Sequence, residues 1–212
     1  MKRVAFVLVA LAALGVAGYA LFMYGTQPLG ARVHPEMRAE FEARPGAIYA
    51  HIFGASVALL LGPLQFLNGL RAARPTLHRA LGWAYLALGV FVGGLAGLYV
   101  AFFAFGGTVS TSGFALLAVL WLYTGARAVL TAKARDFGAH RRWMVRNFAL
   151  ALAAVTLRIG LGIGFASGLA FETFYPPLAW LSWVPNLLLA EWLLARERWG
   201  RNEPVASGAP RG

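Results

Sequence analysis

Two histidines occupy equivalent places in the sequence, each directly before an arginine and at the start of an apolar stretch. They are His78, followed by Arg79, and His140, followed by Arg141. Imidazoles that two helices present at one depth of a bundle can hold a haem iron or build a metal site. The adjacent arginines could bind haem propionates or anionic lipid head groups. The plainer interpretation is a positively charged helix entry, in which each histidine caps a helix or packs at an interface.

Further polar residues lie inside apolar stretches, where a polar group in lipid needs a partner or a function. We expect five of them to line polar pockets in the bundle: His51, Gln65, Arg158, Asn186 and Glu191. Arg158 lies near the middle of its stretch, too deep to reach the cytoplasmic side easily. Its candidate partners are His51, Tyr49, Ser167, Glu172 or a bound anion. In the plainer interpretation, His51 is a neutral imidazole bonded to a neighbouring carbonyl or hydroxyl.

Structural roles are also open for the remaining polar positions. Gln65 and Asn68 follow Gly62-Pro63, so they could bond the backbone groups that the proline frees. Glu191 could form a salt bridge with Arg196, Arg127 or one of the two His-Arg pairs.

Other chemistries are excluded by what the chain lacks. It has no cysteine, which rules out disulfides, thiolate metal sites and a cysteine nucleophile. It contains no glycine-rich phosphate loop, no His-Glu-x-x-His zinc motif and no plausible serine triad. Its eight acidic residues lie mostly in one loop and the tail, too few for a di-metal carboxylate site.

The composition places the chain in a lipid bilayer. Of its 212 residues 59% are hydrophobic and only 13% are charged, with a mean hydropathy of +0.64, whereas a soluble domain carries roughly 25% charged residues. The net charge of +11 does not indicate nucleic-acid binding, because the basic residues form short runs between apolar stretches. Such runs are typical of topology signals and of contacts with lipid head groups.

The sequence predicts an all-α bundle of six transmembrane helices in a single domain over residues 1–200. Six stretches approach the roughly 20 apolar residues that a spanning helix needs, at about 4–24, 47–70, 80–105, 114–130, 143–170 and 178–194. The first is longer than a signal-peptide core and is expected to stay as an anchor. Residues 106–113 are expected to form a turn, Pro176-Pro177 to break the chain before the last helix, and residues 201–212 to be a disordered tail.

The distribution of lysine and arginine predicts the orientation. The basic runs near residues 2–3, 71–79, 133–146 and 196–201 all fall on one side of a six-helix bundle. By the positive-inside rule this side is cytoplasmic, so both termini are expected to face the cytoplasm.

Regularly spaced glycines predict close helix packing. Gly82, Gly89, Gly93 and Gly97 recur in the third stretch, and Gly160, Gly164 and Gly168 recur in the fifth. A four-residue glycine spacing makes a smooth groove that lets two backbones approach closely in lipid.

Taken together, several motifs resemble an uncharacterised bacterial family of predicted membrane proteins, catalogued as a domain of unknown function, over roughly Tyr49 to Trp192. The motifs are His51-Ile52-Phe53-Gly54, Gly62-Pro63-Leu64-Gln65-Phe66, Leu77-His78-Arg79-Ala80-Leu81-Gly82 with Tyr85, His140-Arg141-Arg142-Trp143-Met144, Leu157-Arg158, and Trp183-Val184-Pro185-Asn186 with Glu191. The resemblance implies that these are the family's recurring polar positions, and it brings no established activity.

More loosely, a bundle with histidines near both faces is similar to b-type cytochromes of the cytochrome b561 and ferric-reductase kind, which hold two haems with two histidine pairs. This chain departs from that pattern, because His51 has no counterpart on its side except His34, in a loop beside Pro35. A single haem held by His78 and His140 needs no further histidine. The likeness is one of fold, which does not confer function.

Three functional hypotheses follow. The first is an electron-transfer protein with one haem b bound by His78, His140, Arg79 and Arg141, and with a quinone or another redox partner near Arg158 and His51. The second is a carrier of a small ion or proton along Arg158, His51 and Gln65. The third is a structural or assembly protein without a cofactor.

Overall fold

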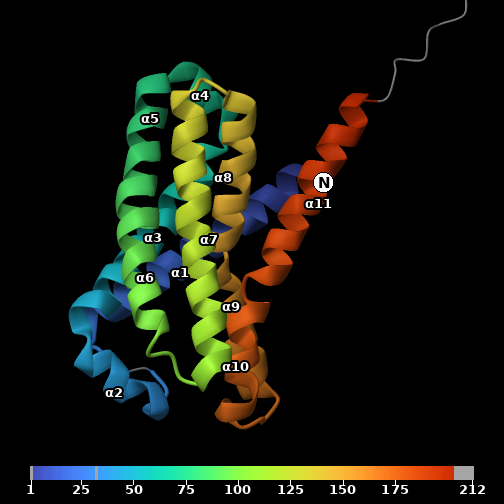
Figure 1. Ribbon diagram of the computed structural model, residues 1–212. Coiled ribbons are helices and arrows are strands. Elements are labelled where there is room, and N and C mark those ends of the chain that lie inside the picture. Colours follow the sequence, from blue (N-terminus) through green and yellow to red (C-terminus); the bar gives the residue numbers. More distant parts are fainter. Residues whose placement is uncertain (1, 32, 203–212) are drawn as a thin grey trace, which may run out of the picture.

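The computed structural model describes residues 2–31 and 33–202, and this part of the chain is helical with no β-strand (Figure 1). The elements are α1 (Lys2–Thr26), α2 (Pro35–Ala43), α3 (Pro45–Gln65), α4 (Asn68–Ala73), α5 (Pro75–Ala84), the π-helix η1 (Tyr85–Val92), α6 (Gly93–Ala101), α7 (Gly107–Lys133), α8 (Phe137–Ala151), α9 (Ala153–Ala166), α10 (Phe171–Leu181) and α11 (Val184–Asn202).

Six helical segments are long and apolar enough to cross a membrane, which confirms the predicted all-α, six-span fold. They are Arg3–Thr26, Pro45–Gln65, Pro75–Ala101, Gly107–Lys133, Phe137–Ala166 and Phe171–Glu197. The third joins α5, η1 and α6, the fifth joins α8 and α9, and the sixth joins α10 and α11. At about 1.5 Å per residue, even the shortest reaches roughly 30 Å, the thickness of the hydrocarbon core.

Helix ends differ from the prediction where local backbone chemistry decides them. The expected turn over 106–113 is shorter, because α7 already begins at Gly107, directly after the left-handed Gly106 (φ +96°). The hydroxyl of Ser112 donates back to the carbonyl of Thr108 at 2.6 Å, so a polar residue remains compatible with the helix. The second span ends at Gln65 rather than at 70.

The predicted break at Pro176-Pro177 is wrong, since both prolines lie inside α10. A proline lacks the N–H that would bond the carbonyl four residues earlier. Because α10 begins at Phe171, only the carbonyls of Glu172 and Thr173 lose their helical hydrogen bond, and both are exposed residues of the first turn. The helix instead breaks at Ser182 and Trp183. Of the tail predicted over 201–212, residues 201 and 202 belong to α11, and residues 203–212 lie outside the described part of the chain.

The glycines of the third span form the predicted groove, and α3 fills it. A Cβ on Gly93 would lie 3.1 Å from the backbone of α3, and one on Gly89 would lie 3.0 Å from the Cβ of Ala58. At the two ends of the groove, the ring of His51 packs against Gly97 and the side-chain oxygen of Gln65 packs against Gly82. The groove therefore sets the depth at which α3 holds these two polar side chains.

In the fifth span only two of the three predicted glycines pack. Gly160 lies against Leu178 and Gly164 lies against the ring of Phe174, so both contact α10. A Cβ on Gly168 would meet nothing within 4 Å, and the residue has a φ of +70°, so its role is to end the helical segment.

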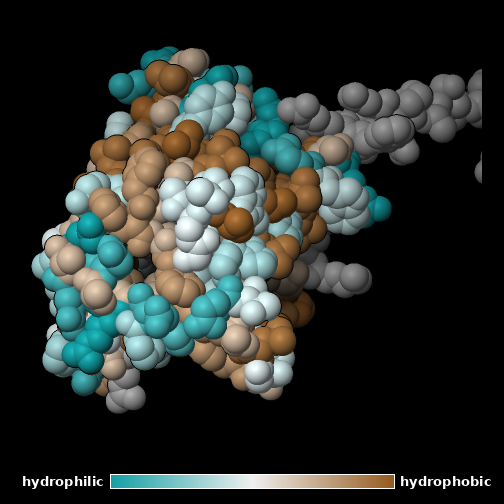
Figure 2. Space-filling view, turned by 60° about the horizontal axis from the view of Figure 1, so that its bottom comes forward, coloured by the Kyte–Doolittle hydropathy of each residue, from teal (hydrophilic) through white to brown (hydrophobic). Residues whose placement is uncertain are grey.

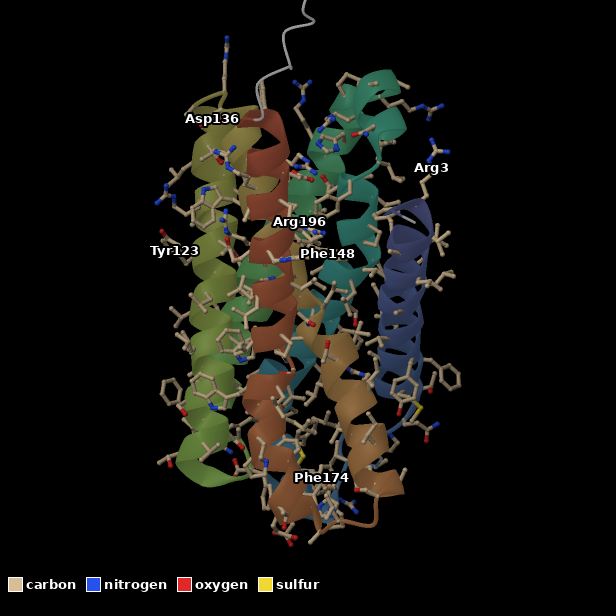
Figure 3. The ribbon with its side chains drawn as sticks, turned by 90° about the vertical axis from the view of Figure 1, so that its right-hand side faces the viewer. Arg3, Tyr123, Asp136, Phe148, Phe174 and Arg196 are labelled. Atoms are coloured by element: carbon tan, nitrogen blue, oxygen red, sulfur yellow. The ribbon has the colours of Figure 1, made fainter. Side chains whose placement is uncertain are left out.

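Figure 3 shows the two ends of the bundle, with Arg3 and Asp136 toward one end and Phe174 toward the other. We name the first the basic end, after Arg71, Arg74, Arg79, Lys133, Arg135 and Arg141. We name the second the aromatic end, after Phe105, Phe165, Phe171, Phe174 and Tyr175, whose rings pack on one another. Here His34 folds back onto the bundle and stacks on Phe171, with ring centroids 3.9 Å apart.

The flanks of the bundle are apolar. Large exposed hydrophobic residues lie along the spans, above all on α1. This helix packs along α3 and makes few contacts with α9. The polar helix α2 lies outside the spans, where hydrophilic side chains gather on the end turned forward in Figure 2. There the carboxylate of Glu42 accepts a hydrogen bond from Arg38 at 2.7 Å, which raises the pKa of that guanidinium.

Candidate functional site

His78 and His140 both lie at the basic end. His78 lies in the first turn of α5, and His140 lies in the first turn of α8. Asp136 caps α8 by accepting the backbone N–H of Ala139 at 2.8 Å, which fixes the start of the helix. The two imidazoles are close enough to interact electrostatically.

A hydrogen bond defines the tautomer of His140. Its Nδ1 lies 2.8 Å from the carbonyl oxygen of Ala128, in the last part of α7. Because a carbonyl oxygen only accepts hydrogen bonds, Nδ1 carries the proton and Nε2 presents a lone pair. Metal-bound histidines characteristically donate their other N–H to a carbonyl or carboxylate in this way.

His78 is not committed to a partner in the same way. Its ring is half-buried, and its Nδ1 is buried without a hydrogen bond in the described part of the chain. Arg71 interacts with this ring electrostatically, while Arg79 is exposed. A buried nitrogen without a partner carries an energetic penalty of about 1–3 kcal/mol, so His78 has capacity for a ligand.

Arg141 is already paired. Its guanidinium makes a two-pronged contact with Glu197 of α11, at 2.5 and 3.0 Å. About half of the Arg141 side chain remains exposed, so this pair is accessible to water and exchange. Of the two arginines expected at haem propionates, Arg79 is therefore the one without a carboxylate contact among the described residues.

His51 lies in a different part of the molecule. Its Nδ1 is 2.9 Å from the carbonyl oxygen of Gly93, so its proton also lies on Nδ1. The ring occupies the space above Gly97. Gly97 follows His78 by 19 residues in the third span, which corresponds to roughly 28 Å along the helix axis. His51 is thus well separated from the pair at the basic end.

Arg158 is closer to the aromatic end than expected. It lies eight residues before the end of α9, roughly 12 Å from that end. Its Nη1 donates to the carbonyl of Ala154 at 2.9 Å; His51 is within electrostatic range, but the two side chains share no hydrogen bond among the described residues. Ser167, another predicted partner, bonds to Gly164 instead. Two neighbours that the sequence analysis missed are Tyr19 and Tyr24 of α1.

The other pocket candidates have separate partners. Asn186 bonds to the hydroxyl of Thr156 and to the carbonyl of Ser182, each at 3.0 Å. The buried Nε2 of Gln65 has no hydrogen bond among the described residues. Of the five expected pocket residues, we find mutual interaction only between His51 and Arg158.

Two expected structural contacts are corrected. Glu191 pairs with Arg146, at 2.5 and 2.8 Å, and not with the arginines predicted for it, because α11 crosses α8 at this level. Asn68 does not bond the backbone near the proline; it begins α4 and accepts a hydrogen bond from Arg71 at 2.9 Å.

The sequence analysis also missed a polar network in the centre of the bundle. The hydroxyl of Tyr85 donates to Oδ1 of Asn147 at 2.6 Å. The amide nitrogen of Asn147 donates to the carbonyl of Trp121 and to the hydroxyl of Thr124, both at 2.8 Å. All four residues are buried. The network ties η1, α7 and α8 together, and its sequence signal was a single asparagine within the apolar fifth span.

The fold and its apolar flanks define a multi-pass integral membrane protein. Residues 48–194 match the family model described as Predicted membrane protein (DUF2306), and the chain belongs to this family. All nine candidate residues lie within the matched range. No curated protein and no solved structure matches the chain, so the likeness to cytochrome b561 gains no support.

Proposed function

We propose that the protein is an electron-transfer protein of the bacterial cytoplasmic membrane that binds one b-type haem at its basic end. In this proposal His78 and His140 would hold the haem iron. When bound, the haem supplies one-electron redox chemistry. The basic end faces the cytoplasm, as the distribution of lysine and arginine indicates.

The observation that carries the proposal is the hydrogen bond between His140 Nδ1 and the carbonyl of Ala128. It holds the ring in one orientation and keeps the Nε2 lone pair available to a metal. The bond comes from α7, whereas the two histidines come from α5 and α8. Three helices thus converge on this ligand.

The state of His78 supports the same assignment. His78 is within electrostatic range of His140, and its buried Nδ1 lacks a hydrogen bond. A metal bond to this ring, with reorientation of the side chain, would supply the missing interaction. A haem also carries two anionic propionates, and Arg79 and Arg71 supply positive charge beside His78. Arg141 can contribute only in exchange for its contact with Glu197.

The same geometry bears on the redox partner. A quinone near His51 would be separated from the haem by much of the length of the third span, roughly 28 Å. We therefore place electron exchange at the basic end, where Arg74 and Arg79 are exposed. The family assignment fits this proposal and does not by itself identify a cofactor.

The test is a reduced-minus-oxidised visible spectrum of the protein purified in mild detergent from haem-supplemented cells. We expect a sharp α-band at about one haem per chain. His78→Ala and His140→Ala should each lose it, whereas the control His51→Ala, with its imidazole at the other end, should retain it. A colourless wild-type protein, or an unchanged spectrum in the His78 variant, would refute the proposal and favour a carrier or a structural protein.

A further inference from the structure

The guanidinium of Arg158 lies inside its span and not at the nearer membrane surface. Its side chain points back along α9 to the carbonyl of Ala154, one turn toward the basic end and away from the nearer end of the span. Helical side chains tilt toward the N-terminus of their helix, which for α9 is the direction of the basic end, so Arg158 is directed away from the nearer membrane surface. The guanidinium therefore stays inside the bundle, where its charge needs compensation.

The protein supplies no anion for this charge among the described residues. Their four ion pairs use Arg38, Arg44, Arg141 and Arg146. Asp136 is engaged as a helix cap. A guanidinium offers five N–H donors, and only one bond of Arg158, to its own helix, is formed.

The groups around Arg158 can add donors for a bound anion. Tyr19 and Tyr24 of α1 interact with the guanidinium, and their hydroxyls form no hydrogen bond in the described part of the chain. His51 on α3 is also within electrostatic range of Arg158, but its N–H is already donated to the carbonyl of Gly93, so it adds no donor. Counted from the ends of their helices, Arg158, Tyr19 and His51 lie about 9–12 Å inside the aromatic end. Three helices thus contribute to one polar layer.

This layer is open toward lipid. Figure 3 shows α1 at the edge of the bundle, beside α3 and α9. α1 packs along α3 but contacts α9 only sparsely, and Tyr19 is 53% exposed. The lipid-facing side of α1 is lined by apolar residues such as Phe22. A ligand with an apolar tail can therefore approach between α1 and α9 from the bilayer.

We propose that Arg158, Tyr19 and Tyr24 form a binding site for an oxyanion, a carboxylate or phosphate, that enters between α1 and α9. The planar guanidinium fork matches the two oxygens of such a group. The source of the oxyanion is an acidic lipid or a free anion. The site is separate from the haem proposed at the basic end and does not depend on it.

The experiment is native mass spectrometry of the purified full chain, titrated with phosphatidylglycerol, phosphatidylcholine or inorganic phosphate. We expect the wild-type protein to retain phosphatidylglycerol in preference to phosphatidylcholine. Arg158→Gln should weaken phosphatidylglycerol binding tenfold or more, and Tyr24→Phe should weaken it about threefold, since it loses one donor. The matched control is Arg127→Gln, which removes an exposed arginine of α7 and should bind as the wild type does.

Arg158→Lys separates charge from shape, because it keeps the cation and loses the fork; intermediate binding is expected. This variant and Tyr24→Phe also keep the test valid if Arg158→Gln does not fold, as judged by its elution profile. If inorganic phosphate binds the wild type, displaces the lipid and fails to bind Arg158→Gln, the oxyanion site stands with a free anion as its source. Equal binding of both lipids, or equal phosphatidylglycerol binding by Arg158→Gln and Arg127→Gln, would overturn the proposal.

Discussion

Among the described glycines, Gly54 of α3 is the one at which an added Cβ would come nearest to the backbone of another helix, and it yields a sharp prediction for the variant Gly54→Ala. A Cβ at this position would lie 2.6 Å from the Cα of Gly93 and 3.0 Å from the carbonyl oxygen of Leu88. All of the nearest atoms belong to backbone, so no side-chain rotation can relieve the clash. The helices themselves must separate.

The size of the effect follows from that geometry. Moving the added Cβ from 2.6 Å to an ordinary contact distance of 3.4 Å requires α3 and α6 to separate by about 0.8 Å. A gap of this size forfeits a quarter to a half of the attraction of each contact that it opens. Overpacking of this kind typically costs about 1–3 kcal/mol, and a backbone clash belongs at the upper end. Alanine regains about 1 kcal/mol of helix propensity, which leaves a net loss of about 2 kcal/mol.

The assay is equilibrium unfolding in mixed micelles, compared with Gly162→Ala. Gly162 lies on the exposed side of α9, and a Cβ there would meet nothing within 4 Å. We expect this control to be neutral or slightly stabilised. Gly164→Ala should fall between the two, because its Cβ meets the ring of Phe174, a side chain that can move. Equal stability of Gly54→Ala and Gly162→Ala would show that the helix contact is not as tight as described.

Two further predictions concern the core and the orientation. Asn147→Leu should lower stability by about 1–3 kcal/mol because it leaves the buried hydroxyl of Tyr85 without its acceptor. Adding Tyr85→Phe should restore part of that loss in the same unfolding assay, and a simply additive loss would contradict the network. Because the chain has no cysteine, a single Ala134→Cys at the basic end should react with an impermeant thiol reagent only after the cells are permeabilised. Thr108→Cys, at the other end of α7, should react in intact cells, and the reverse pattern would contradict a cytoplasmic basic end.

The six spans were predictable because each needs only length and apolar composition, which the sequence displays directly. The groove of Gly82, Gly89, Gly93 and Gly97 was predictable for a related reason, since small residues at helical spacing have few uses in lipid other than close packing. Helix ends such as Gly107 were less predictable, because they depend on single backbone angles and local hydrogen bonds.

Partnerships between helices could not be read from the sequence. The pairing of Glu191 with Arg146 depends on how α11 crosses α8, and several arginines were available at similar depth. The proximity of Tyr24 to Arg158 likewise requires the tertiary position of α1. For the pair His78 and His140, the sequence singled out the residues, and the structure adds that both lie at the basic end and that the proton of His140 is on Nδ1. Whether they bind haem stays a prediction.

The π-helix η1 has a consequence for comparing this chain with its relatives. A π-helical turn holds more residues than an α-helical one, so η1 carries extra length that an ordinary helix would lack. Each residue of an α-helix turns the chain by about 100°. Deleting one residue within η1 would therefore rotate Gly93 and Gly97 away from α3 unless the segment rewound. Alignments of this family should accordingly permit a one-residue gap inside the third span, because a gap-free alignment could match lipid-facing positions with groove positions.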